Sequence, residues 1–299
     1  MKAGFLQYKP LFGRVDHNLD RIEALIESTD ADLLVLPELF NTGYVFTSKA
    51  EVAELAEEFP GGRTVKRLTE IARRKRMHIV AGIAERYAGR LFNSAALVTP
   101  AGFGGTYRKI HLFSEEKRWF DPGDLPFEVY EIGSCRIGMM VCFDWFFPES
   151  MRVLSLKGAE IVCHPANLVL PFCQDAMVTR CLENRVFAIT ANRTGTEDRG
   201  GGHSLRFTGK SQITAPDGSI LHRAAEEAEC IEVVEIDPAR ARDKRLNPFN
   251  DLFGDRRPEF YGEIGRLSST RRPSREQAPE PSPTSRSDTD PTQTPRSHC

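Results

Sequence analysis

The sequence predicts an α/β protein, because strand-like and helix-like segments alternate along most of the chain. Short apolar runs typical of buried strands are followed by longer segments whose apolar residues have helical spacing. A strand-rich middle region interrupts this alternation, which then returns. Because no Pro/Ser-rich linker interrupts residues 1–264, we expect one large domain over that range.

The first part of the chain has the clearest alternation. A run of four apolar residues at 33–36 is typical of a buried strand, and Pro37 ends it. The expected elements are strand 4–7, helix 17–28, strand 33–36, helix 64–76 and strand 78–85.

Strands dominate the region from 91 to 142. Gly and Pro-Gly turns separate them, so neighbouring strands are expected to pair as a meander. They are 92–99, 104–108, 127–132 and 136–141. The alternation returns with 149–157, 160–164, 175–184 and 186–191, and with late strands at 210–214 and 230–236.

The C-terminal segment 265–299 has a different composition. It is rich in Ser, Thr, Pro and Arg and has almost no large apolar side chains. Such a segment cannot bury enough surface to offset the entropy lost on ordering. We predict a disordered tail, with a docking or phosphorylation segment as its functional alternative.

Composition excludes several classes of protein. The chain has 40 Lys plus Arg and 42 Asp plus Glu, for a formal charge of −2, so it has no broad basic surface for nucleic acid. Its longest uncharged stretches are too polar to span a membrane, and its first residues are too short an apolar run for a secretory signal. We therefore expect a cytoplasmic protein.

The seven cysteines do not form a recognisable framework. No two of them are spaced as C-x-x-C, which argues against a disulfide scaffold, a zinc ribbon or a thiol redox pair. Most are expected to be small buried side chains in a reducing compartment. Cys142 is the exception, because it follows a strongly apolar strand and precedes a turn and a helix start at Pro148. A thiol there could be a nucleophile, and a plain buried cysteine is the alternative.

Two charged residues also follow apolar strands. Glu38, next to Pro37, lies among apolar residues. Desolvation of its carboxylate there would disfavour the charged form, which suits a general base; a solvated loop acid is the alternative. Lys109 could supply positive charge to a developing oxyanion, or could belong to a surface charge cluster. Only the combination of Glu38, Lys109 and Cys142 is informative.

Three motifs in this order resemble the nitrilase, or carbon-nitrogen hydrolase, superfamily. They are Leu-Pro-Glu-Leu-Phe-Asn-Thr-Gly-Tyr at 36–44, Tyr-Arg-Lys-Ile-His-Leu-Phe at 107–113, and Val-Cys-Phe-Asp-Trp-Phe-Phe-Pro-Glu at 141–149. The resemblance extends from about residue 2 to about residue 262 and looks closest to prokaryotic nitrilases and small-amide amidases. It implies a four-layer α-β-β-α sandwich with two mixed sheets face to face.

The resemblance also implies the roles of the site residues. Cys142 would be the nucleophile, Glu38 the general base, Lys109 the stabiliser of the tetrahedral intermediate and Glu116 a supporting second glutamate, although spacing alone does not separate Glu116 from Glu115. No metal and no organic cofactor are needed. The residues expected at the substrate are Tyr44, Phe143, Trp145 and Asn167, with the Phe143 N–H group at the oxyanion. His111 and His164 are expected to be packed, hydrogen-bonded residues rather than a catalytic base.

The predicted function is hydrolysis of a small amide through a thioester, with release of ammonia. A nitrilase or an N-carbamoyl amidohydrolase is the alternative within the family, and a catalytically silent binding homologue is a further one. The expected partners are a small-molecule substrate and a second copy of the chain, in a homodimer or larger even assembly, with no nucleic acid and no membrane. The glycine-rich segment 198–203 is read as a mobile loop near the pocket mouth, since it lacks a P-loop pattern.

Overall fold

The computed structural model describes residues 1–266, which form a compact unit from Met1 to Asp255 and a separate short segment from Arg256 onward. That segment contains two 3₁₀ turns, η3 (Pro258–Phe260) and η4 (Gly262–Gly265). Most of the predicted tail, residues 267–299, lies outside the described residues.

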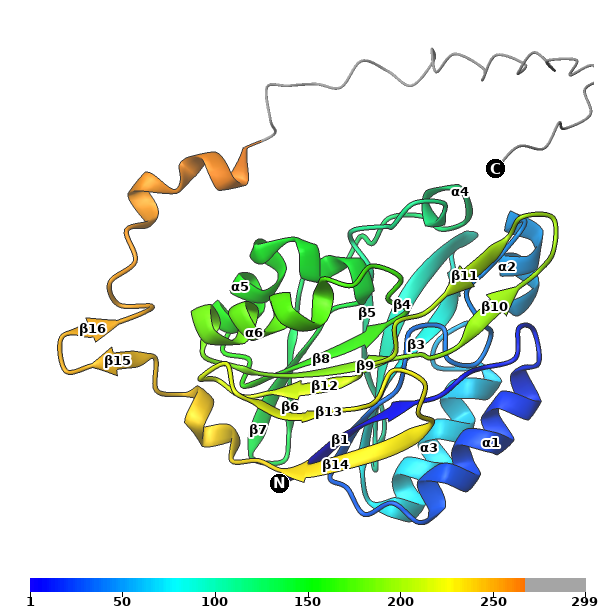
Figure 1. Ribbon diagram of the computed structural model, residues 1–299, viewed down its shortest axis with the longest axis horizontal. Helices are drawn as coiled ribbons and strands as arrows, with labels where there is room; N and C mark the ends of the chain where they lie inside the picture. The colour runs from blue at the N-terminus through cyan, green and yellow to red at the C-terminus, as the bar shows by residue number, and fades with distance from the viewer. Residues whose placement is uncertain (267–299) are drawn as a thin grey trace, which may run out of the picture. The chain divides into compact units, whose positions relative to one another are not determined.

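Two six-stranded mixed sheets dominate the compact unit (Figure 1). The first has the order β14-β1-β2-β3-β4-β5, and the second has the order β13-β12-β9-β8-β7-β6. The strands of the first sheet are β1 (Lys2–Gln7), β2 (Leu33–Val35), β3 (His78–Tyr87), β4 (Arg90–Thr99), β5 (Gly102–Arg108) and β14 (Cys230–Glu235). Those of the second are β6 (Val129–Ile132), β7 (Cys135–Met139), β8 (Ile161–Ala166), β9 (Phe187–Asn192), β12 (Gln212–Thr214) and β13 (Ile220–Arg223).

Helices cover the outer face of each sheet. Figure 1 shows α1 (Val15–Glu27) with α3 (Arg63–Lys75), and α5 (Pro148–Leu156) with α6 (Cys173–Asn184), on opposite sides of the sheets. The shorter elements are α2 (Lys49–Leu55), α4 (Glu116–Trp119), η1 (Cys142–Phe146) and η2 (Pro238–Ala241). The predicted four-layer α-β-β-α sandwich is therefore confirmed.

The alternation of side chains along β1 explains how the layers pack. Phe5 belongs to the core between the two sheets, where it clusters with residues such as Met139 and Ile161 of the second sheet. The next residue, Leu6, points to the other face and joins the core under α1 and α3. Because neighbouring strand residues face opposite sides, a fully apolar strand can serve both cores at once.

The predicted meander is wrong at one place. β3 pairs with β4, β4 with β5, and β6 with β7, all antiparallel, but β5 and β6 lie in different sheets. The connection from 109 to 128 carries the chain from one sheet to the other and includes α4. This crossing is what brings charged residues of the first sheet close to the end of β7.

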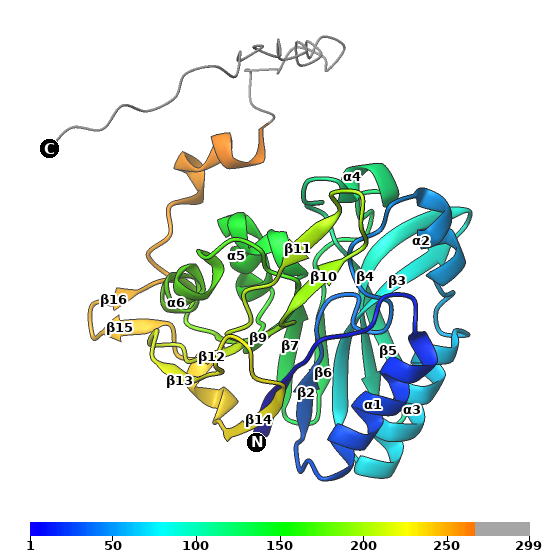
Figure 2. The same cartoon turned by 45° about the vertical axis from the view of Figure 1, so that its right-hand side comes forward.

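The glycine-rich segment forms the tip of a hairpin. Strands β10 (Thr196–Asp198) and β11 (Ser204–Arg206) pair antiparallel, and Figure 2 shows this hairpin rising near α4. A second small hairpin joins β15 (Arg245–Asn247) and β16 (Asn250–Asp251). Among residues 1–266, no helix combines the length and apolarity needed to cross a membrane.

Candidate active site

The loop after β2 presents Glu38 to the interior. Pro37 ends the strand, and backbone hydrogen bonds then tie the loop to β3, from Phe40 N to Gly82 O at 3.0 Å and from Gly82 N to Pro37 O at 3.1 Å. A Cβ atom on Gly82 would lie 2.3 Å from the Cα atom of Glu38. Only glycine therefore permits the close approach that buries Glu38 completely.

Lys109 follows β5 and is held by its backbone on both sides. Its N–H group donates to the carbonyl of Asn93 on β4 at 2.8 Å, and its own carbonyl accepts from Gly123 N at 2.9 Å. The side chain is completely buried, as is almost all of Glu116, the first residue of α4. The connection between the sheets thus places the ammonium of Lys109 and the carboxylate of Glu116 next to each other in the interior.

Glu38, Lys109 and Glu116 form a buried charge cluster. The Nζ atom of Lys109 lies 2.7 Å from Oε1 of Glu38 and 2.8 Å from Oε1 of Glu116. Two further side chains donate to the carboxylates, Asn93 to Oε1 of Glu38 at 2.7 Å and Tyr44 to Oε1 of Glu116 at 2.5 Å. An ammonium with two carboxylate partners is the arrangement that makes buried charges tolerable.

The two oxygens of Glu38 are not equivalent. Oε1 accepts from both Lys109 and Asn93, whereas Oε2 is buried and no residue in the described range 1–266 donates to it. Burial raises the pKa of Glu38, and this effect outweighs the opposing influence of Lys109. A carboxylate with one free oxygen and a raised pKa is suited to accept a proton from a group facing that oxygen.

Cys142 begins η1, just beyond β7, in the left-handed backbone region with φ of 43°. Two buried side chains hold this unusual turn. Asp144 Oδ2 accepts from Val141 N at 2.9 Å, and His164 Nε2 lies 2.9 Å from the carbonyl oxygen of Cys142. Because a carbonyl only accepts, Nε2 of His164 carries a proton and donates. A strained non-glycine residue held by several partners is typical of a functional turn.

The Cys142 thiol shares its environment with the charge cluster. Burial raises the pKa of Cys142 well above its ordinary value, and the negative charge of Glu38 raises it further, whereas Lys109 and the N–H group of Asn167 act in the opposite direction. Burial also acts to lower the pKa of Lys109, but Glu116 and Glu38 outweigh it and keep that pKa above its usual value. At neutral pH the resting site therefore holds a protonated thiol beside an ammonium.

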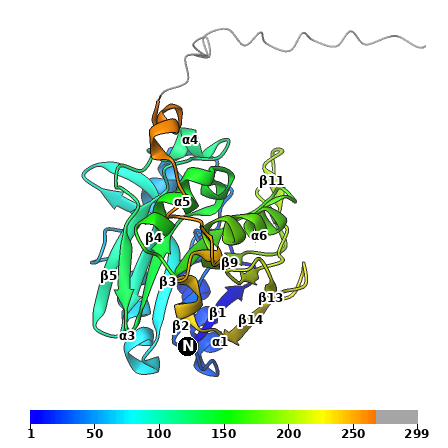
Figure 3. The same cartoon turned by 90° about the vertical axis from the view of Figure 1, so that its left-hand side faces the viewer.

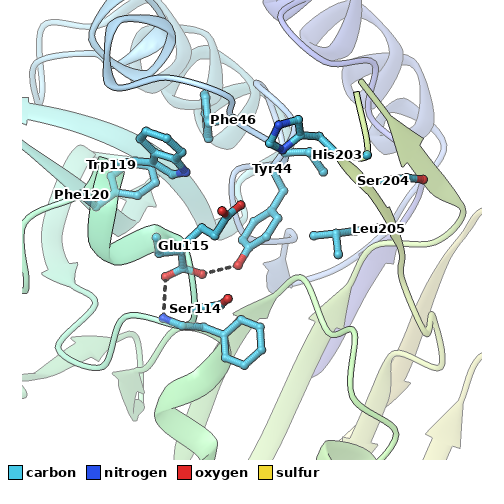
Figure 4. A pocket seen from close by; sticks show the side chains of 13 residues that line it. Tyr44, Phe46, Ser114, Glu115, Trp119, Phe120, His203, Ser204 and Leu205 are labelled. Atoms are coloured by element: carbon cyan, nitrogen blue, oxygen red, sulfur yellow. Dashed lines mark hydrogen bonds between the residues drawn. The ribbon is translucent and has the colours of Figure 1, made fainter. Parts of the chain in front are cut away.

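Two cavities lie around this cluster. A crevice of about 20 Å³ is lined by Cys142 together with three residues predicted from the sequence, Phe143, Trp145 and Asn167. A larger cavity of about 190 Å³ is lined by the fourth, Tyr44, and by residues of α4 and of the hairpin tip (Figure 4). Phe113 lines both cavities.

The structure separates the two neighbouring glutamates. Glu116 contacts Lys109, and its Oε2 accepts from the N–H group of Phe113 at 3.2 Å, whereas the half-exposed Glu115 contacts Arg118. Glu116 is thus the one that belongs to the charge cluster.

Neither candidate histidine is paired with the thiol. His111 stacks on Phe147 with ring centroids 3.6 Å apart, and its Nδ1 lies 2.7 Å from Asp144. His164 binds the carbonyl of Cys142 through one nitrogen and Thr190 through the other. Both are hydrogen-bonded, packed residues, as expected. Within residues 1–266, no group of three or more His, Cys, Asp or Glu side chains is arranged to hold a metal ion.

Two residues of the site were missed by sequence reasoning. Asn93 contacts Glu38 directly, and Glu197 holds the loop that carries Tyr44, accepting from Tyr44 N at 3.0 Å and from Val45 N at 2.5 Å. Asn93 and the adjacent Ser94 are two polar residues between apolar runs of β4, which is a signal that could have drawn attention to Asn93. Glu197 directly precedes the segment 198–203 that was read as a loop, and no pattern marks it.

Comparisons with known proteins identify the family of this chain. A family model described as carbon-nitrogen hydrolase matches residues 2–246. The chain is 48% identical over 264 residues to a protein named nitrilase from Pyrococcus abyssi, covering 87% of this chain and 99% of that protein. It is 35% identical over 268 residues to an (R)-stereoselective amidase from a Pseudomonas species, covering 88% and 94%.

A solved structure gives a similar result. An amidase variant from a Nesterenkonia species, with acrylamide added at its active-site cysteine, has a TM-score of 0.72 and 26% identity and covers 88% of this chain and 99% of that one. With a matching family model, relatives aligned over nearly their full length and the same fold, this chain belongs to the carbon-nitrogen hydrolases of the nitrilase superfamily.

Proposed function

We propose that the protein hydrolyses a small carboxamide through a thioester on Cys142 and releases ammonia. The observation that carries this proposal is the free, buried Oε2 atom of Glu38 in a site shared with the Cys142 thiol and the Lys109 ammonium. A thiol with a raised pKa is a poor nucleophile until a neighbouring base takes its proton. Glu38 is the group suited to that task.

The first half of the reaction forms the thioester. The sulfur of Cys142 attacks the carbonyl carbon and forms a C–S bond, while the thiol proton passes to Oε2 of Glu38. Negative charge then develops on the substrate oxygen, where the Lys109 ammonium and the Phe143 N–H group stabilise it. The proton moves from Glu38 to the substrate nitrogen as the C–N bond breaks, and ammonia leaves.

The second half regenerates the thiol. A water molecule gives a proton to Glu38 and attacks the thioester carbon, forming a C–O bond. The C–S bond breaks, the carboxylic acid leaves, and Cys142 takes the proton back from Glu38. Glu116 acts through Lys109, since its carboxylate keeps the ammonium charged and in place.

Asn93 sets which oxygen of Glu38 acts as the base. Together with Lys109 it occupies Oε1, so Oε2 is the oxygen left to exchange a proton. Asn93 touches neither the substrate nor the thiol in this scheme and is therefore a positioning residue.

A nitrile is the second candidate substrate, because the relative from Pyrococcus abyssi at 48% identity is named nitrilase. Addition of the thiol to a nitrile gives a thioimidate, and one water converts this to the thioester with loss of ammonia. From that point the two reactions are the same. N-carbamoyl compounds are the third substrate class that the same groups could serve.

The experiment that tests the proposal measures ammonia released from matched short amides, nitriles and N-carbamoyl amino acids. We expect release from the amides to exceed that from the nitriles, and Cys142→Ala to abolish both. A matched control is Cys181→Ala, which alters a buried cysteine in α6 away from the charge cluster. Thiol-dependent release from nitriles alone would replace the amidase by a nitrilase, and release unaffected by Cys142→Ala would contradict the mechanism.

We also propose that the chain forms a homodimer or a larger even assembly through α5 and α6, which lie side by side (Figure 3). Large apolar side chains are exposed on and next to this helix pair, which supports a covered surface there. They are Phe146, Val153, Leu156, Phe172 and Leu182. Sedimentation of the wild type and of Leu156→Glu/Leu182→Glu tests this, and a monomeric wild type would contradict it.

A further inference from the structure

The larger cavity has an aromatic wall. Tyr44, Phe46, Trp119 and Phe120 line it from one side, and the tip of the β10–β11 hairpin, with His203, closes it from the other (Figure 4). Aromatic faces carry negative electrostatic potential and attract a cation placed over them. With about 190 Å³, against about 20 Å³ for the crevice at Cys142, the cavity has room for the part of a substrate beyond the reacting group.

The carboxylates that line the cavity are those of Glu115 and Glu116. Among the described residues, no lysine or arginine lines it. Glu116 is already engaged by Lys109 and Tyr44. The carboxylate of Glu115 points into the cavity in Figure 4, and only its Oε1 atom has a partner, Arg118 at 3.0 Å.

The cavity is linked to the reacting groups by direct contacts. The hydroxyl of Tyr44, on its floor, donates to Glu116, which in turn contacts Lys109. Phe113 lines both this cavity and the crevice at Cys142. Phe113 is therefore the residue at which the two cavities adjoin, and we take a substrate held at Cys142 to extend past it into the aromatic cavity.

We infer that this cavity binds a positively charged end of the substrate, so that the favoured substrates are amides whose acyl chain ends in a primary ammonium group, with Glu115 as the residue that selects for it. This inference rests on the proposed function for the identity of the reacting group. An anionic end would meet the carboxylate of Glu115, and the cation paired with that carboxylate, Arg118, does not line the cavity. A neutral apolar end would gain the aromatic contacts but not the charge interaction.

Two variants should change the selectivity in opposite directions. Glu115→Gln keeps the size of the side chain and removes its charge, so the preference for a cationic over a neutral end should fall about threefold to fivefold. Arg118→Gln removes the partner of Glu115 and leaves the carboxylate free for the substrate, so the same preference should rise. Lys117→Gln is the matched control, since Lys117 is an exposed cation of α4 that does not line the cavity.

The kinetic experiment compares kcat/KM for sets of amides that end in ammonium, methyl or carboxylate groups, at several chain lengths. It is run at about pH 8, where a primary ammonium end with a pKa of about 10 remains charged. We expect the ammonium series to be the best and the carboxylate series the worst at the optimal length. A ratio that Glu115→Gln leaves unchanged would overturn the inference.

A binding experiment separates this inference from the proposed reaction. Calorimetry on Cys142→Ala with the same three kinds of amide measures recognition without turnover. Tighter binding of the ammonium series, lost in Cys142→Ala/Glu115→Gln, would support the cavity assignment even if the wild type hydrolysed none of them, and only the proposed function would then fail. Equal binding of the three series would overturn the cavity assignment even if all were hydrolysed.

Discussion

Asn93 donates a hydrogen bond of 2.7 Å to Oε1 of Glu38, although 55 residues separate them in the sequence. The same oxygen accepts from Lys109, so one side of the carboxylate is saturated with donors while the other is free. This asymmetry assigns different tasks to two chemically identical atoms, one for anchoring and one for proton transfer.

Replacing Asn93 by Ala should lower kcat about tenfold and leave KM nearly unchanged, because the variant loses an interaction with the base rather than with the substrate. The hydrogen bond from Asn93 lowers the pKa of Glu38, so its loss raises that pKa. The acid limb of the pH profile of kcat/KM should accordingly move to higher pH.

Ser94→Ala is the control for this variant. Ser94 follows Asn93 on β4 and is equally buried, but it donates to Glu85 instead of to the site. It should leave the acid limb in place. A wild-type pH profile in Asn93→Ala would contradict the role given to Asn93.

Replacing Lys109 by Met should abolish turnover and also destabilise the fold. At neutral pH two carboxylates would remain buried without their cation, which costs about 3–5 kcal/mol when a buried pair is broken. Without Lys109, burial and the charge of Glu116 would raise the pKa of Glu38 in the folded state further above that in the unfolded state. The loss of stability should therefore shrink as the pH falls, because the folded state then binds the extra proton.

Urea unfolding at about pH 7 and about pH 5 measures this effect, with the exposed Lys117→Met as control. A variant as stable as the wild type at both pH values would show that the ammonium is not needed to hold the two carboxylates.

Glu197→Gln should destabilise the protein through Arg193. The buried guanidinium of Arg193 lies 2.6 Å from Oε2 of Glu197, while the other oxygen holds the loop at Tyr44. Gln keeps an acceptor for the loop but leaves the positive charge unpaired, at a cost of about 3–5 kcal/mol. Arg193→Met/Glu197→Gln should regain most of this free energy of unfolding, which a double-mutant cycle measures. Additive effects of the two single variants would contradict the coupling.

The stability of the protein should depend on pH through His164. Burial lowers the pKa of His164 from 6.5 to about 4, so the folded state resists protonation that the unfolded state accepts. Its contribution to stability is complete above pH 6.5 and is lost as the pH falls toward 4, by about 3 kcal/mol in total.

Denaturant unfolding of His164→Asn over this range should lack that component, whereas the exposed His17→Asn should keep it. If the wild type and His164→Asn lose stability in parallel between these pH values, His164 is not the titrating group.

Most strand and helix positions could be predicted because buried elements show regular patterns of apolar residues in the sequence. The run before Pro37 and the strand before Cys142 are apolar on both faces, as expected where one face packs on helices and the other on a second sheet. Strand β13 (Ile220–Arg223) was not predicted, since it is an edge strand whose residues are mostly exposed. The assignment of β5 and β6 to different sheets depends on tertiary packing, which adjacent strand patterns do not encode.

The site was predictable only in part for a related reason. The structure brings Glu38, Lys109 and Glu116 together. Sequence motifs had singled out Glu38 and Lys109, whereas Glu116 was implied by the family resemblance and was not separated from Glu115 by spacing. Asn93 contacts one oxygen of Glu38, and Glu197 accepts from the backbone of the loop that carries Tyr44. Both residues are far in the sequence from the groups they contact, so no local spacing reveals them. Tests of the proposed catalytic roles should therefore include variants of Asn93 and Glu197 as well as of the residues that the sequence indicated.

Two carboxylates and one ammonium are buried beside a neutral thiol, so the net charge of the site matters at each step of the proposed reaction. When a proton moves from Cys142 to Glu38, the negative charge changes place but the sum over the cluster does not. A low-dielectric interior penalises a new net charge far more than a displaced one. At the reacting atoms the proposed cycle takes in neutral amide and water and expels neutral ammonia and acid, so it is electroneutral at every exchange with solvent.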